Sequence, residues 1–272
     1  MKLERIQLVE GHPDVYLDTY VAEPMKGLVR KALLVIPGGA YLHVGAGEGE
    51  PVVQAFMPYG YNAFVLHYTV GENNGRPFPS QLIEATLAIK HIKDHADEYG
   101  IDPEELFVVG FSAGGHLAGT VATMWKREDV MEAAGIPYGY NKPKGVMLIY
   151  PMISPDYSNC EKYTHAWETL LGCENPPKEL LDMAAVEKHA DADSAPIFLA
   201  HTFNDPIVDV RNAMALGNAY AEAGVPFEMH IYPDGPHGLS VANETSARGR
   251  PGYINPAFAE WVRLAAAWAE TL

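Results

Sequence analysis

The stretch that decides the fold runs from Leu106 to Val121 and reads LFVVGFSAGGHLAGTV. Its first four residues form an uninterrupted apolar run, which predicts a β-strand buried on both faces. A helical pattern begins at Gly115, and Ser112 stands between them in a GxSxG motif. In this context the motif predicts a tight strand-to-helix turn that exposes the serine hydroxyl at the carboxyl edge of a sheet. A glycine-rich turn with a capping serine is the alternative interpretation.

Similar strand and helix patterns alternate along the rest of the chain. Apolar runs that predict strands lie at 32–36, 62–67, 146–150 and 196–200, and a more alternating run lies at 227–232. Helical patterns lie at 51–59, 79–98, 208–223 and 256–272. This alternation predicts an α/β fold with a mostly parallel central sheet and helices on both faces.

Two further stretches complete the predicted organisation. Residues 6–23 predict an antiparallel pair of strands that leads into the sheet. Residues 154–190 are weakly patterned, and we expect a small cap insertion there, at the ends of the strands. Because no repeat, low-complexity tract or linker divides the chain, we expect residues 1–272 to form a single domain that carries this cap.

Composition limits the possible partners. The 272 residues carry 19 Lys and Arg against 35 Asp and Glu, which is a formal net charge of −16. An acidic surface repels phosphate groups, so we expect no nucleic-acid partner and no docking on a membrane. The N-terminus lacks the apolar core of a signal peptide, and the chain has two cysteines, Cys160 and Cys173. These features favour a cytoplasmic protein and are compatible with a homodimer.

A serine hydroxyl needs a base to take its proton before it can attack a carbonyl group. In hydrolases with this type of turn, an acid and then a histidine follow the serine, on turns after later strands. Asp205 and His237 occupy such turns, so we predict Ser112, Asp205 and His237 as catalytic residues. Asp209 is the alternative acid, although its place before a helical pattern suits an N-cap better. His43 is the alternative base.

A second motif, PGGAY at residues 37–41, follows an early predicted strand. Acyl transfer requires two backbone N–H groups aimed at the carbonyl oxygen as it becomes negative. Ala113 would supply one of them, and Gly39 or Ala40 would supply the other. We therefore predict an oxyanion hole formed by Gly39, Ala40 and Ala113, with a plain glycine turn as the alternative.

With these motifs the chain resembles the α/β-hydrolase superfamily, and within it the bacterial acetylxylan-esterase-like group related to the hormone-sensitive-lipase esterases. The resemblance covers nearly the whole chain. It rests on residues 37–41, 48–51, 60–66, 101–103, 110–118, 150–154, 223–228 and 237–240. Carried over by position, the catalytic triad of that group falls on Ser112, Asp205 and His237, and the resemblance implies the α/β-hydrolase fold.

The chain departs from the pattern of that group at several places. Ala40 stands where a third glycine is usual, and Asp209 stands where a proline is usual. The segment before Glu48 lacks an expected arginine, and residues 127–141 resemble an insertion. Substrate range is therefore the property that the resemblance transfers least securely.

The motifs and the resemblance together predict a serine carboxylesterase for short-chain acyl esters, such as acetyl esters of xylooligosaccharides. No metal or organic cofactor is implied. Tyr41, Tyr68, Phe111 and Trp167 are candidate walls of the substrate pocket, with core packing as the alternative. The acidic surface disfavours substrates rich in uronic acid, unless a basic residue such as Arg76 offsets it.

Two other classes of protein share these motifs. An amidase such as an arylformamidase, or a small peptidase, would use the same triad. An interaction protein on an inactive hydrolase scaffold is the alternative outside enzymes, although such proteins typically lose the serine or the histidine. Covalent labelling with a fluorophosphonate separates this last class from the enzymes.

Overall fold

The computed structural model describes residues 1–71, 75–157 and 160–272. In this part of the chain, eight strands form one sheet in the order β1-β2-β4-β3-β5-β6-β7-β8. The strands are β1 (Lys2–Gln7), β2 (Tyr16–Val21), β3 (Arg30–Ile36), β4 (Tyr61–His67), β5 (Ile101–Phe111), β6 (Gly145–Ile149), β7 (Ile197–Thr202) and β8 (Phe227–Tyr232). β1 pairs with β2, and β2 with β4, in antiparallel fashion, while strands β3 to β8 run parallel. The parallel sheet is present as predicted. The antiparallel pair is present too, although its first strand begins at Lys2 and not at residue 6.

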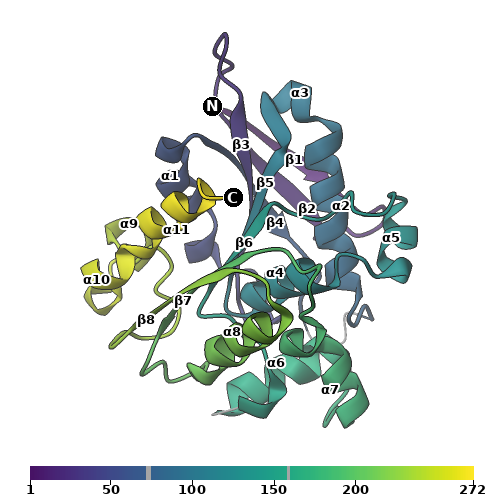
Figure 1. The fold of residues 1–272 in the computed structure, drawn as a ribbon, viewed down its shortest axis with the longest axis vertical. Coiled ribbons are helices and arrows are strands. Elements are labelled where there is room, and N and C mark those ends of the chain that lie inside the picture. Colours follow the sequence, from purple (N-terminus) through teal and green to yellow (C-terminus); the bar gives the residue numbers. More distant parts are fainter. Residues whose placement is uncertain (72–74, 158–159) are drawn as a thin grey trace.

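Helices cover both faces of this sheet (Figure 1). The longer helices are α1 (Glu50–Phe56), α2 (Ser80–Asp94), α4 (Ala113–Met124), α5 (Glu128–Ala134), α6 (Glu161–Leu171), α7 (Lys178–Ala184), α8 (Arg211–Ala223) and α11 (Trp261–Ala269). The single-turn helices are α3 (Ala96–Tyr99), α9 (Glu244–Ala247) and α10 (Pro256–Ala259). The helices α1, α10 and α11 lie on one face, and α2, α4 and α8 lie on the other.

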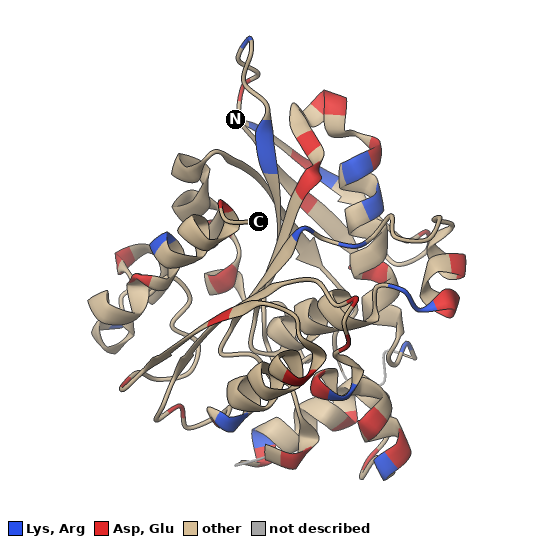
Figure 2. Cartoon of the chain, in the orientation of Figure 1, with Lys and Arg blue, Asp and Glu red and all other residues tan. Residues whose placement is uncertain are grey.

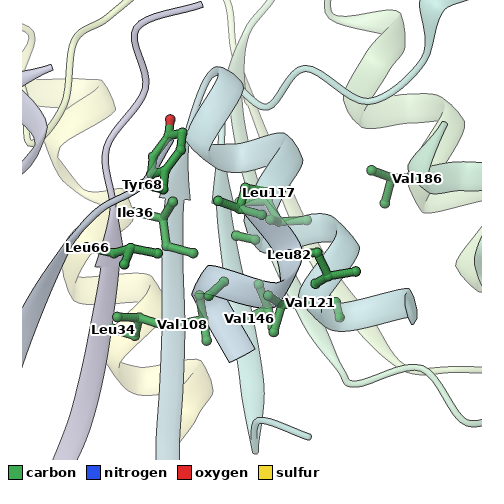
Figure 3. Packing of buried hydrophobic residues seen from close by; sticks show 14 of the residues in the cluster. Leu34, Ile36, Leu66, Tyr68, Leu82, Val108, Leu117, Val121, Val146 and Val186 are labelled. Carbon is green, nitrogen blue, oxygen red and sulfur yellow. The ribbon is translucent and has the colours of Figure 1, made fainter. Parts of the chain in front are cut away.

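Each central strand contributes to two cores, because successive side chains of a strand point to opposite faces. In β3, Leu34 and Ile36 pack under α2 and α4, as Figure 3 shows. Their neighbours Leu33 and Val35 pack against α1 and α11 on the other face. This double burial explains why the strands are continuous apolar runs in the sequence.

The boundaries of several elements differ from the sequence pattern. β5 begins five residues before the apolar run at 106–109 and ends at Phe111. The helix expected at 208–223 begins at Arg211, because residues 203–210 form the turn that holds Asp205. The stretch expected to be a cap contains α6 and α7, and its residues 158–159 lie outside the described part of the chain. The division into one domain with a cap stays a prediction.

Acidic residues outnumber basic ones, 35 to 19. Figure 2 shows Asp and Glu on helices of both faces of the sheet. Within the described residues, no helix combines the length and apolar character needed to cross a membrane.

Candidate active site

Ser112 lies at the junction of β5 and α4, with φ 54° and ψ −119°. Its backbone N–H donates to the carbonyl oxygen of Ile149 on β6, at 3.1 Å. Two close backbone approaches require the flanking glycines. A Cβ on Gly110 would lie 2.3 Å from the carbonyl oxygen of Gly114, and a Cβ on Gly114 would lie 2.2 Å from that of Ile36. The GxSxG motif therefore forms the expected turn because backbone fills the space that side chains would need.

Ser112, His237 and Asp205 form one hydrogen-bonded chain. Oγ of Ser112 lies 2.7 Å from Nε2 of His237, and Nδ1 of His237 lies 2.7 Å from Oδ2 of Asp205. The side chain of Asp205 is fully buried, and its Oδ1 accepts the backbone N–H groups of Ile207 and Val208 at 2.8 and 2.9 Å. The carboxylate is thus fixed behind the imidazole by its own turn.

The electrostatics around Asp205 favour its ionised form. Burial by itself raises the pKa of this carboxyl, but the hydrogen bond with His237 and the nearby histidines lower it below its usual value. His201 lies beside it, with Nε2 bonded to the carbonyl oxygen of Val208 at 2.9 Å. Burial lowers the pKa of His201 to about 4, so this ring is neutral at pH 7.

The alternative acid and base occupy other positions. Oδ1 of Asp209 accepts the backbone N–H of Arg211, and its Oδ2 pairs with the guanidinium at 2.7 Å. Asp209 therefore belongs to the start of α8, whereas Asp205 contacts His237. His43 lines the cavity in front of Ser112.

The backbone of the turn at 37–41 faces Ser112. Gly39 and Ala40 have φ of 132° and 56°, and both line the cavity together with Ala113. Within the described residues, the N–H groups of Gly39 and Ala40 have no hydrogen-bond partner. Ala113 begins α4, where N–H groups lack partners inside the helix. The three residues predicted for an oxyanion hole therefore come together beside Ser112.

Sequence reasoning missed a buried bridge between this turn and the histidine-bearing segment. Oε2 of Glu48 accepts the N–H of Gly38 at 2.7 Å, and its Oε1 accepts the hydroxyl of Tyr150 at 2.8 Å. The same hydroxyl accepts the N–H of Ser240, and the Tyr150 ring packs against His237. Burial raises the pKa of Glu48, while the two hydrogen bonds act against that rise. Residues 48–51 stood out in the sequence, but nothing there indicated that Glu48 bonds Tyr150, which lies 102 positions later.

The cavity in front of Ser112 has a volume of about 490 Å³. Its apolar wall combines Met152 with residues of α6 and of the turn after β7, namely Tyr163, Ala166, Ile207 and Val208. The lining also includes residues 43–48, His237 and residues of the segment 248–253. An ester placed there would reach Ser112, His237 and the predicted oxyanion groups together.

The four aromatic residues predicted as pocket walls do not line this cavity, and that prediction was wrong. Each is at most 2% exposed. The hydroxyl of Tyr41 bonds Nδ1 of His116 at 2.6 Å, and that of Tyr68 bonds a backbone carbonyl oxygen. Phe111 and Trp167 pack among other aromatic rings. These side chains point into the hydrophobic cores because helices cover both faces of the sheet.

A family model described as BD-FAE matches residues 17–220. The chain belongs to the BD-FAE family. It is 37% identical over 228 residues to endo-1,4-beta-xylanase B from Butyrivibrio fibrisolvens, covering 82% of this chain and 34% of that protein. It is 29% identical over 218 residues to an acetylxylan esterase from Xylanibacter ruminicola, covering 77% of this chain and 41% of that protein. The BD-FAE chain thus spans less than half the length of these curated relatives.

The solved structures include relatives of similar length. The acetyl ester-xyloside bifunctional hydrolase from Caldicellulosiruptor lactoaceticus is 30% identical, with a TM-score of 0.80 over 98% of this chain and 96% of that chain. MGS-M1, an alpha/beta hydrolase from a deep-sea metagenome library, is also 30% identical, with a TM-score of 0.79 over 100% of this chain and 97% of that chain. The fold of the BD-FAE chain is therefore that of the α/β hydrolases. Several relatives carry names of ester hydrolases, among them the acetylxylan esterase and the acetyl ester-xyloside bifunctional hydrolase.

Proposed function

We propose that this chain is a serine carboxylesterase that hydrolyses short-chain acyl esters, with acetyl esters of xylooligosaccharides as its substrate class. The observation that carries the proposal is the continuous hydrogen-bonded chain from Ser112 through His237 to Asp205, with 2.7 Å at each link. The names of the relatives support the carbohydrate side of the proposal, since they include an acetylxylan esterase and an acetyl ester-xyloside hydrolase.

In the proposed mechanism, Oγ of Ser112 attacks the ester carbonyl carbon while Nε2 of His237 takes its proton. The tetrahedral intermediate collapses, and Nε2 returns the proton to the departing alcohol, which leaves the acyl group on Oγ. Water then attacks this acyl-enzyme, with His237 again as the base, and releases the acid and free Ser112. Asp205 holds the imidazole in the tautomer with a proton on Nδ1 and stabilises the imidazolium.

The oxyanion that forms in both steps needs N–H donors at its position. We assign this role to Ala113 and to Gly39 or Ala40, whose N–H groups border the cavity beside Ser112. The start of α4 adds the positive end of a helix dipole. Such preorganised donors are worth about 3 kcal/mol each in other acyl-transfer enzymes.

A small acyl group fits the apolar wall of the cavity. Tyr163 and Ala166 of α6 lie on that wall together with Met152. The cavity of about 490 Å³ must also hold the alcohol, which leaves limited room for a long acyl chain. We therefore expect acetate esters to be hydrolysed faster than octanoate esters.

The experiment that tests the proposal compares the wild type with Ser112→Ala. We expect the variant to fold normally and to lose turnover of p-nitrophenyl acetate by a factor on the order of 10⁴ to 10⁶. A fluorophosphonate should label the wild type at Ser112 and leave the variant unlabelled. Full turnover by the variant would refute the nucleophile, and faster cleavage of formylkynurenine or dipeptide amides than of acetylated xylooligosaccharides would favour the amidase alternative. The cytoplasmic location and the homodimer stay predictions.

A further inference from the structure

Three cationic side chains line the cavity in front of Ser112: Lys162, Arg248 and Arg250. They stand out because the chain as a whole has a formal net charge of −16. Most lysines and arginines elsewhere pair with a carboxylate, but within the described residues these three have no such partner. The carboxyl group that lines the same cavity, Glu48, already accepts two hydrogen bonds.

Local contacts position the two arginines. Arg250 donates from Nε to the carbonyl oxygen of Ala247 at 3.2 Å, and its guanidinium lies 3.7 Å from the centroid of the Tyr253 ring. These contacts leave its terminal NH₂ groups available to a ligand. Arg248 ends α9, which begins in a capping box, and lies against Gly47. The guanidinium of Arg250 is therefore held at the cavity, and Arg248 reaches the cavity from the end of α9.

Both arginines follow His237 in the chain, on a segment that is tied back where Ser246 bonds the carbonyl oxygen of Leu239 and where Arg248 lies against Gly47. His237, Gly238 and the segment 248–253 line the cavity together with residues 43–48. The apolar residues of α6 and Val208 suit the acyl group instead. Lys162 belongs to α6 as well, so it is not counted with the two arginines. Since His237 returns a proton to the departing alcohol in the proposed mechanism, the alcohol must lie on its side. The two arginines consequently border the alcohol part of the substrate.

We propose that this site prefers esters whose alcohol carries a carboxylate, such as an acetylated oligosaccharide with a uronic acid residue, and that Arg248 and Arg250 bind that carboxylate. This inference rests on the proposed function. A guanidinium binds a carboxylate through parallel charge-assisted hydrogen bonds, so two unpaired guanidinium groups form a suitable receptor. Arg76, the basic residue singled out from the sequence, pairs with the buried Glu84 at 3.1 Å and does not line the cavity.

A matched pair of probes isolates the charge on the alcohol. 4-Acetoxybenzoate and 4-acetoxybenzamide release alcohols of the same shape, one anionic and one neutral. We expect the double variant Arg248→Gln/Arg250→Gln to lower kcat/KM for the benzoate by about tenfold and to change that for the benzamide by less than about twofold. For the wild type, added salt should lower kcat/KM for the benzoate selectively, because ions screen exposed charges.

Lys26→Gln is the control variant. Lys26 is exposed in the connection between β2 and β3, near the opposite edge of the sheet, and has no carboxylate partner among the described residues (Figure 1). This variant also replaces a positive charge with a neutral amide, but it does so away from the cavity. Both probes should therefore keep their wild-type kcat/KM.

Three results would overturn the inference. The first is an equal loss on both probes in the double variant, and the second is no loss on the benzoate. The third is a larger loss on the mono-4-nitrophenyl ester of succinate, which carries its carboxylate on the acyl group. Failure of the proposed function is distinguishable, because Ser112→Ala would then still hydrolyse the neutral benzamide probe.

Discussion

The floor of the cavity and its mouth are built in different ways. At the floor, the turn of Ser112 and the turn at 37–41 meet backbone to backbone, with no room for a Cβ on Gly110 or Gly114. At the mouth, the segment 248–253 is largely exposed, and Gly252 has nothing within 4 Å of an added Cβ. This difference in packing separates the part of the site that holds the reacting groups from the part that meets the rest of the substrate. We expect the fixed geometry to serve the reaction, and the exposed side chains to set substrate preference because they can change at little cost to the fold.

The largest expected effect concerns the acid at the floor. Asp205→Asn should lower kcat by a factor on the order of 10⁴, because an asparagine favours the wrong tautomer of His237. Asp209→Asn is the matched control, since Asp209 pairs with Arg211 at 2.7 Å and not with the histidine. It should stay within about twofold of the wild type. Kinetics with p-nitrophenyl acetate measure both, and a severe loss in Asp209→Asn alone would reverse the assignment of the acid.

Alanine at two glycines tests the contrast in packing directly. Gly114→Ala should destabilise the fold by several kcal/mol, on the order of 3 or more, because its Cβ would meet backbone at 2.2 Å. Gly252→Ala should change the free energy of unfolding by no more than about 0.5 kcal/mol. Urea denaturation measures both. Equal stability of the two variants would contradict the difference in packing between the floor and the mouth of the cavity.

The buried bridge at the floor should matter for the reaction as well as for stability. Tyr150→Phe removes the hydroxyl that joins Glu48 to the N–H of Ser240. We expect kcat to fall about tenfold, a loss of about 1.4 kcal/mol, because the two turns lose their connection. Tyr140→Phe removes an exposed hydroxyl that bonds Asp94, and its kcat should not change. A Tyr150→Phe variant that is less stable but equally fast would limit the bridge to a structural role.

A smaller effect is expected in the pH dependence of stability. His116 is fully buried, and burial lowers its pKa to about 4 from 6.5. Between these values the unfolded state binds a proton that the folded state does not, so stability falls as pH decreases through this window, by up to about 1.4 kcal/mol per unit. His116→Gln should reduce the slope of unfolding free energy against pH between 6.5 and 4. The contribution of His201, whose pKa burial also lowers to about 4, should remain. An unchanged slope would contradict the neutral, buried histidine.

The three proposed catalytic residues were predictable because their signals are local in the sequence. The GxSxG turn follows from an apolar run, two glycines and a helical pattern within 16 residues. Asp205 and His237 were found because each follows a predicted strand, and parallel strands bring their carboxyl ends to one edge. Position along the chain therefore implied position in space for these residues.

The walls of the cavity were not predictable in the same way. Tyr41 and Phe111 stand next to predicted site residues, yet their side chains are buried in cores on the faces of the sheet. Glu48 and Tyr150 carried no sign that they would bond across 102 positions. The direction of a side chain depends on how the strands and helices pack together. So do hydrogen bonds between residues that are far apart in the sequence.

By itself, then, the sequence determined the α/β fold, the serine turn and the order of the predicted triad, because strand, turn and helix preferences act over a few neighbouring residues. The tertiary structure alone decided that Arg248 and Arg250 come to the cavity while Arg76 pairs with Glu84. Formal net charge sums over the whole chain, whereas a substrate meets only the charges that folding brings to one place.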